Sequence, residues 1–225
     1  MSMEMNTIVD AVKQSPGDAA RPDSGGTGQR ALGLSRGELL RLAHQLFAAS
    51  DAPRSIVFCG AQADDSCGWV CAGTAEVLAD LTMRPICVVD ANFAAPSLHS
   101  YFGVDRSPGL SDLMVESGPL KDFAKPVRGE RLWVMPCGSP LREPGALCYA
   151  SAFRFRMEEL RTQFDFVLFN GGPGLDYPGA AQFAPAADGA VLVVKSNSTR
   201  REEAIRVKQT LAAANLAMLG AVLVD

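Results

Sequence analysis

The chain has 225 residues, a formal net charge of -4 and a hydrophobic fraction of 48%. This composition suits one globular domain with a sizeable core, and the acidic balance gives no support for nucleic-acid binding through a basic surface. No apolar run approaches the ~20 residues of a membrane helix, and the N-terminus lacks the basic and apolar regions of a signal peptide. We therefore expect a cytoplasmic protein with no direct membrane insertion.

The N-terminal part of the chain differs in composition from the rest. Residues 13–29 are rich in Pro, Gly, Ser and charged residues, which cannot bury enough apolar surface to become ordered. This predicts a flexible tail over residues 1–30 and a folded domain over residues 31–225. The domain begins with a predicted amphipathic helix, 35–49, in which Ser35 and Glu38 have the spacing of a capping box.

Apolar runs alternate with amphipathic segments along the domain. The runs lack the alternation of half-exposed strands, so they are typical of strands covered on both faces. The expected strands are Ser55–Cys59, Pro85–Asp90, Leu132–Met135, Phe166–Phe169, Ala190–Val194 and Leu219–Val224. The expected helices between them include Trp69–Ala79, Ser151–Gln163 and Thr199–Ala214. This order predicts an α/β fold with a doubly wound, mostly parallel sheet and helices on both faces, whose ligands bind beyond the carboxyl ends of the strands.

The first strand, the loop after it and the next helix have the layout of a phosphate-binding P-loop. The loop and the first helical residue are Gly60, Ala61, Gln62, Ala63, Asp64, Asp65, Ser66, Cys67, Gly68 and Trp69. A P-loop needs glycines for close backbone approach, a Lys for the phosphates and a Ser or Thr hydroxyl for Mg²⁺. Ser66, Cys67 and Gly68 stand where Gly, Lys and Ser/Thr are expected, and Asp64 and Asp65 add negative charge.

Cysteine spacing gives no sign of a metal site. Among the six cysteines, Cys67 and Cys71 form a C-x-x-x-C pattern, but neither His44 nor His99 lies near them in the sequence. We expect reduced thiols and no metal.

Several segments together resemble the bacterial tyrosine kinases of polysaccharide export (BY-kinases), relatives of the MinD/ParA P-loop ATPases. The resemblance covers about residues 38–225 and is most specific in Val88–Gly103, which is similar to V-D-x-D-x-R-x-P-S-L-H, and in the following Pro108–Leu113. Glu38, Arg41 and His44 resemble the E-x-x-R-x-x-R oligomerisation motif of that family, with His in place of the last Arg. These side chains could equally form only a helix cap and a solvated face.

The chain departs from the family pattern at the residues that carry its chemistry. By resemblance, Cys67 replaces the P-loop Lys and Gly68 the metal-binding hydroxyl. Asp90 matches the first acid of a second Walker motif, but Asn92 replaces its second acid, and Asn170 stands at the Walker B Asp. Cys, Gly and Asn supply none of the charge that phosphoryl transfer and Mg²⁺ require.

The resemblance therefore implies a catalytically degenerate BY-kinase-like protein without a bound cofactor. We expect it to act as a regulatory or scaffolding partner in exopolysaccharide synthesis or export. Its partner would be a membrane polysaccharide chain-length regulator or an active homologue, and a partner could recruit it to the inner membrane. The protein could also form a homo-oligomer. One alternative is a residual ATP- and Mg²⁺-binding ATPase or kinase; another treats Cys67 as a reactive thiol at a helix N-terminus.

Overall fold

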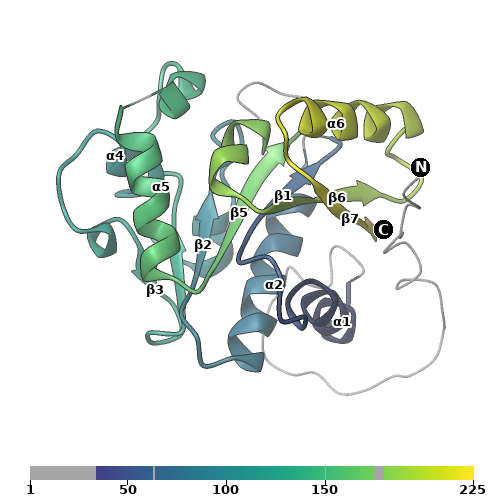
Figure 1. Ribbon diagram of the computed structural model, residues 1–225, viewed down its shortest axis with the longest axis horizontal. Coiled ribbons are helices and arrows are strands. Elements are labelled where there is room, and N and C mark those ends of the chain that lie inside the picture. The colour runs from purple at the N-terminus through teal and green to yellow at the C-terminus, as the bar shows by residue number, and fades with distance from the viewer. Residues whose placement is uncertain (1–33, 63, 150, 175–179) are drawn as a thin grey trace.

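The structure, a computed structural model, describes residues 34–62, 64–149, 151–174 and 180–225. Its centre is a seven-stranded sheet in the order β3-β4-β2-β5-β1-β6-β7, in which only the short edge strand β3 is antiparallel (Figure 1). The strands are β1 (Ser55–Gly60), β2 (Ile86–Asp90), β3 (Lys125–Pro126), β4 (Leu132–Met135), β5 (Phe166–Pro173), β6 (Gly189–Lys195) and β7 (Met218–Val224). The doubly wound, mostly parallel sheet expected from the sequence is confirmed.

One face of the sheet is covered by α1 (Arg36–Phe47), α2 (Ser66–Leu81) and α3 (Leu98–Phe102). Apolar side chains of α1 and α2 pack on the inward residues of the central strands and form one of two core clusters. The two helices approach closely at Gly73, where an added Cβ would collide with the side chain of Leu39. Gly73 leaves the space that the end of the Leu39 side chain occupies.

The second core cluster lies on the opposite face of the sheet. It is built by α4 (Leu110–Leu113), α5 (Ser151–Gln163), α6 (Arg201–Ala213) and the 3-10 helices η3 (Leu120–Asp122), η4 (Pro144–Tyr149) and η5 (Ala180–Ala186). Its centre is aromatic: Phe183 of η5 lies between Phe169 of β5 and Phe153 of α5, with ring centroids 5.4 Å and 5.8 Å away.

The structure corrects two predicted boundaries and adds one strand. Helix α2 begins at Ser66, three residues before the predicted start at Trp69, because the loop residues Ser66–Gly68 already form its first turn. Strand β5 continues through Asn170 to Pro173, where we expected the strand to stop at Phe169. The antiparallel strand β3 escaped prediction, because a two-residue strand containing Pro126 carries no apolar pattern.

Two further expectations concern the ends of the domain and the membrane. The predicted flexible tail, residues 1–30, lies outside the described residues. In the part of the chain that the structure describes, no helix is both long and apolar enough to cross a membrane.

Candidate functional site

Strand β1 and helix α2 place the loop between them at the carboxyl end of the sheet. Ala61 continues the line of β1 by donating its amide to the carbonyl of Val193 over 3.2 Å. The carboxylate of Asp64 accepts the amide of Ser66 over 2.9 Å, while Asp65 takes the N-cap position without a side-chain bond. Asp64 therefore helps to start α2, as a capping residue would. Ala63, the remaining residue of the loop, lies outside the described residues.

Cys67 lies in the first turn of α2, but its thiol faces the core. Its side chain is 2% exposed and belongs to the cluster on the α1 and α2 face. Burial raises the pKa of Cys67 well above its ordinary value, and a backbone contact from Gly172 lowers it by less. The reactive-thiol hypothesis required a lowered pKa and an accessible sulfur, and the structure contradicts both.

Asp90, the last residue of β2, is completely buried. One carboxylate oxygen accepts the backbone amides of Ser97 and Leu98, each over 2.9 Å. The other accepts the side-chain amide of Asn170 over 3.0 Å and the backbone amide of Asn92 over 3.4 Å. A carboxylate offers about four lone-pair sites, so these four donors occupy its full hydrogen-bonding capacity.

The charge of Asp90 is compensated by dipoles alone. Burial raises its pKa from 3.8 to about 6, although its hydrogen bonds lower it. The bonds from Ser97 and Leu98 come from the start of α3, so Asp90 fixes that helix to the end of β2. This carboxylate therefore has a structural role in the described structure.

Asn170 and Asn92 approach Asp90 from different directions. Asn170 lies directly opposite Asp90 in the register of β2 and β5, and it is also completely buried. Its side-chain oxygen has no hydrogen-bond partner among the described residues, and the same holds for the hydroxyl of Ser66. The side-chain oxygen of Asn92 accepts the amide of Ala95 over 3.1 Å. Asn92 also packs against Gly172, where an added Cβ would collide with the Asn92 side chain.

Gly68 is enclosed by the same group of residues. A Cβ built on Gly68 would collide with the hydroxyl oxygen of Ser97 and lie 3.3 Å from the amide nitrogen of Asn170. The space beside the start of α2 is thus filled by Ser97. This residue lies in the segment that resembles the BY-kinase motif, but it was not among the predicted site residues.

The remaining loop residues contact neighbouring segments. Trp69 is half-buried and packs edge-to-face on Tyr101 of α3, with ring centroids 4.6 Å apart. Gln62 donates to the carbonyl of Ser198 over 3.1 Å and accepts its hydroxyl over 2.9 Å, and it reaches Glu203 of α6 at 3.4 Å. These bonds tie the loop to the segment between β6 and α6. Sequence reasoning missed them, because partners 136 residues apart leave no local signal.

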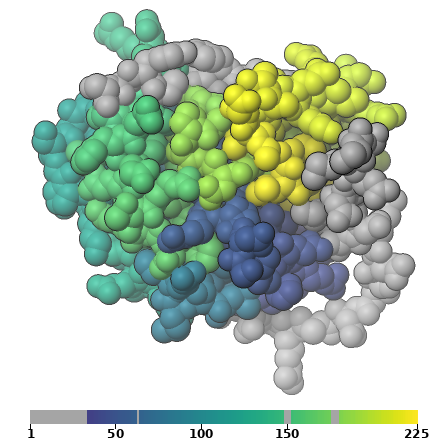
Figure 2. All heavy atoms as spheres, viewed as in Figure 1, coloured from purple at the N-terminus to yellow at the C-terminus, as the bar shows by residue number. Residues whose placement is uncertain are grey.

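The three residues of the predicted oligomerisation motif share one side of α1. Glu38 completes the capping box: its carboxylate accepts the amide of Ser35 over 2.6 Å and the hydroxyl of Ser35 over 2.8 Å. Arg41 and His44 are exposed, and α1 lies on the molecular surface (Figure 2). The capping role of Glu38 is confirmed, and the interface role of the three residues stays a prediction.

The relatives found by sequence comparison are bacterial tyrosine-protein kinases. The chain is 25% identical over 140 residues to the tyrosine-protein kinase YwqD of Bacillus subtilis, covering 62% of this chain and 59% of YwqD. It is 31% identical over 185 residues to the putative tyrosine-protein kinase EpsB of Ralstonia solanacearum, covering 81% of this chain and 24% of EpsB. The chain thus matches less than two thirds of the length of either relative. No protein-family model matches it.

Solved structures share the fold. The chimerical protein CapA2B2 superposes with a TM-score of 0.77 at 23% identity, over 83% of each chain. MinD of Pyrococcus horikoshii, complexed with Mg-ADP, gives a TM-score of 0.62 at 22% identity, over 76% of this chain and 69% of MinD. By its sequence relatives and its fold, the chain is a homologue of the bacterial tyrosine kinases and has the P-loop fold that these kinases share with the MinD ATPases.

Proposed function

We propose that this chain is a BY-kinase homologue without ATP-dependent chemistry, which acts as a regulatory or scaffolding partner in exopolysaccharide synthesis or export. One observation carries the proposal: four N–H donors saturate the carboxylate of Asp90, from Ser97, Leu98, Asn170 and Asn92. Mg²⁺ is bound through anionic oxygens with free lone pairs. A metal, or a water bound to it, would have to displace these donors and dismantle the start of α3.

The other positions around Asp90 do not fit a nucleotide-bound metal either. Gly68 supplies no hydroxyl, and its neighbour Ser97 leaves no room for a larger residue. Asn170 offers a neutral amide, and residues 60–68 contain neither Lys nor Arg to balance the phosphates. Since phosphoryl transfer depends on positioning and on fixed positive charge, these residues support a role without catalysis.

A scaffold of this kind acts through its surface. The contact that resemblance to the BY-kinases implies is formed by Glu38, Arg41 and His44 of α1, of which Arg41 and His44 are exposed. The occupant would be the cytosolic end of a membrane chain-length regulator, an active homologue or a second copy of this chain.

A residual nucleotide site is the alternative, and one observation favours it. The side-chain oxygen of Asn170 and the hydroxyl of Ser66 are buried without a partner in the described part of the chain. Both lie near the first turn of α2, where free amides favour anions. A helix terminus contributes only about 0.3–1 kcal/mol, which is far less than the lost charged contacts.

Calorimetry with ATP and Mg²⁺ distinguishes the proposed non-catalytic protein from a residual nucleotide site. The protein concentration is chosen so that a site of micromolar affinity would be saturated. We expect no binding heat and no shift of the thermal midpoint, while YwqD serves as the positive control under the same conditions. Saturable micromolar binding would overturn the proposal, and hydrolysis would then be measured on the same sample.

A further inference from the structure

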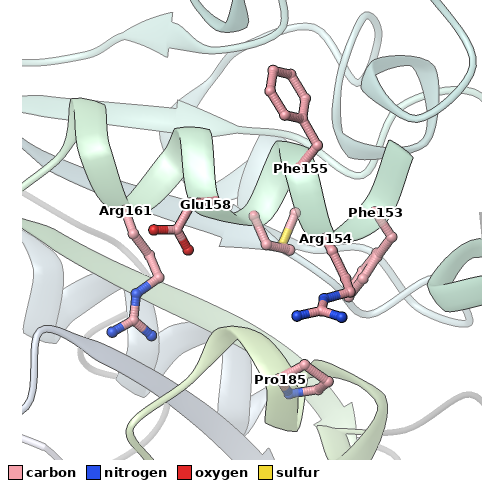
Figure 3. A pocket seen from close by; sticks show the side chains of 7 residues that line it. Phe153, Arg154, Phe155, Glu158, Arg161 and Pro185 are labelled. Carbon is pink, nitrogen blue, oxygen red and sulfur yellow. The ribbon is translucent and has the colours of Figure 1, made fainter. Parts of the chain in front are cut away.

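A hollow of about 420 Å³ lies between α5 and η5, on the face of the sheet opposite α1 and α2. Its lining residues are Phe153, Arg154, Phe155, Met157, Glu158, Arg161 and Pro185 (Figure 3). Ligand pockets in proteins span roughly 300–1,000 Å³, so this hollow has room for one or two side chains of a partner. None of its lining residues belongs to the P-loop region.

The base of the hollow is apolar and fixed. Phe153 and Met157 are 2% and 3% exposed, and Phe153 packs on Phe183 of η5. The ring of Pro185 forms the opposite wall (Figure 3). Because these groups belong to the core, the hollow is held open by the fold, and an incoming apolar side chain would not have to order it first.

The arginines of α5 have different partners. Arg156 donates to the carbonyls of Gly118 and Glu116 and pairs with Glu159 at 2.9 Å, which attaches α5 to the segment before η3. Arg161 donates to the carbonyl of Ala186 and pairs with Asp188 at 2.9 Å, which closes one end of the hollow.

Arg154 has no such structural partner. It is exposed, and among the described residues its guanidinium has neither a hydrogen bond nor an ion pair. Figure 3 shows that Arg154 and Arg161 extend from α5 toward the side of Pro185, with Glu158 between them along the helix. The polar rim thus carries the free guanidinium of Arg154, the paired guanidinium of Arg161 and the carboxylate of Glu158. A guanidinium binds carboxylates with two parallel hydrogen bonds, so the free group selects for an anion.

We propose that this hollow is a docking site for an acidic peptide segment of a partner protein. One apolar side chain of the segment would enter between Met157 and Pro185, and a neighbouring carboxylate would pair with Arg154. Phe155 also lines the hollow and is 68% exposed. The site is independent of the nucleotide region, so this proposal and the proposed loss of catalysis can fail separately.

The test uses the full chain and the peptide Glu-Glu-Phe-Glu-Asp-amide, labelled with fluorescein at its N-terminal amine, with fluorescence anisotropy as the readout. We expect saturable binding that weakens with salt, and about tenfold weaker binding for Arg154→Ala. Arg201→Ala is the matched control, because Arg201 is an exposed arginine on α6, away from the hollow. Glu158→Gln should strengthen binding, since it removes a like charge from the rim.

Amide chemical shifts locate the peptide. Perturbations are expected at residues 153–161 and at residues 184 and 186, which flank Pro185. An analogue with Gln and Asn in place of the acids should bind much more weakly. The absence of binding, equal binding of the neutral analogue, or an unchanged affinity of Arg154→Ala would each overturn the proposal. A dimer in sedimentation that Arg154→Ala dissociates would also overturn it, because a second copy would then be the occupant.

Discussion

The hydroxyl of Ser97 lies in the space that a Cβ of residue 68 would take. Gly68 is in the first turn of α2, and Ser97 immediately precedes α3. The two helices meet here at the carboxyl ends of β2 and β5. Because Gly68 has no side chain, the hydroxyl of Ser97 fits beside it. A position that resemblance assigns to a metal-binding hydroxyl is therefore part of the packing.

This relationship predicts the effect of Gly68→Ala. In an exposed helix the change would stabilise by about 1 kcal/mol through helix propensity. Here the new methyl group forces Ser97 to move away from Asn170, and we expect a net loss of about 1 kcal/mol in the free energy of unfolding. Urea unfolding of the single variant measures it.

A double-mutant cycle with Ser97→Ala provides the control. Removal of the hydroxyl makes room for the methyl group, so Gly68→Ala should become neutral or stabilising in the Ser97→Ala background. Equal effects of Gly68→Ala in both backgrounds would show that the two residues do not compete for space.

The buried carboxylate of Asp90 predicts a pH dependence. Its pKa is about 6 in the folded protein and 3.8 as the ordinary value. The folded state therefore holds the proton more tightly, and stability decreases as pH rises from about 4 to about 6. Each pKa unit corresponds to ~1.4 kcal/mol, so the change is on the order of 3 kcal/mol. Above about pH 7, where the carboxylate is ionised in both states, the contribution is constant.

Other acids titrate in the same range, and Asp90→Asn removes only this group. The difference in unfolding free energy between wild type and Asp90→Asn should fall between about pH 4 and 7 and then stay flat. The carboxyl carbon of Asp90, followed by NMR, should titrate near pH 6. Titration near 3.8 would contradict the account of a carboxylate stabilised only by dipoles.

The fold could be predicted from the sequence because its elements have strong local signals. Continuous apolar runs identify the buried strands, and the Ser35 and Glu38 capping box is present where the spacing placed it. The start of α2 was less visible, because small residues such as Gly68 in a helical turn look like a loop in the sequence. The antiparallel edge strand β3 has no periodicity to detect.

The candidate site was only partly predictable. Asp90 and Asn170 could be expected at the same sheet edge, and the register places them side by side. The saturation of Asp90 by backbone amides depends on how the chain turns into α3, which side-chain types do not encode. The burial of Cys67 likewise follows from packing against Gly172 and the core, so the sequence left its thiol open to a reactive interpretation.

Thiol chemistry tests that burial. Five free cysteines are buried in the described part of the chain, and burial raises the pKa of Cys59 and of Cys137 to about 12. Cys148 is replaced by Ser in this test, because its side chain is not among those that the structure describes. In this Cys148→Ser background we expect the remaining thiols to react slowly with Ellman's reagent until the protein unfolds. Rapid modification of Cys67 in the native protein, located by mass spectrometry, would restore the reactive-thiol hypothesis.

The last prediction separates the two roles assigned to α1. Ser35→Ala removes the hydroxyl of the capping box and should cost about 1 kcal/mol in stability. Arg41→Gln and His44→Gln change exposed side chains, so stability should change by less than ~0.5 kcal/mol. If this side of α1 is an interface, these two variants should weaken self-association, measured by analytical ultracentrifugation, while Ser35→Ala leaves it unchanged at temperatures where the protein stays folded. If the interface lies elsewhere, all three variants should self-associate as strongly as the wild type. Helix α1 would then serve stability alone, through its capping box and its apolar face.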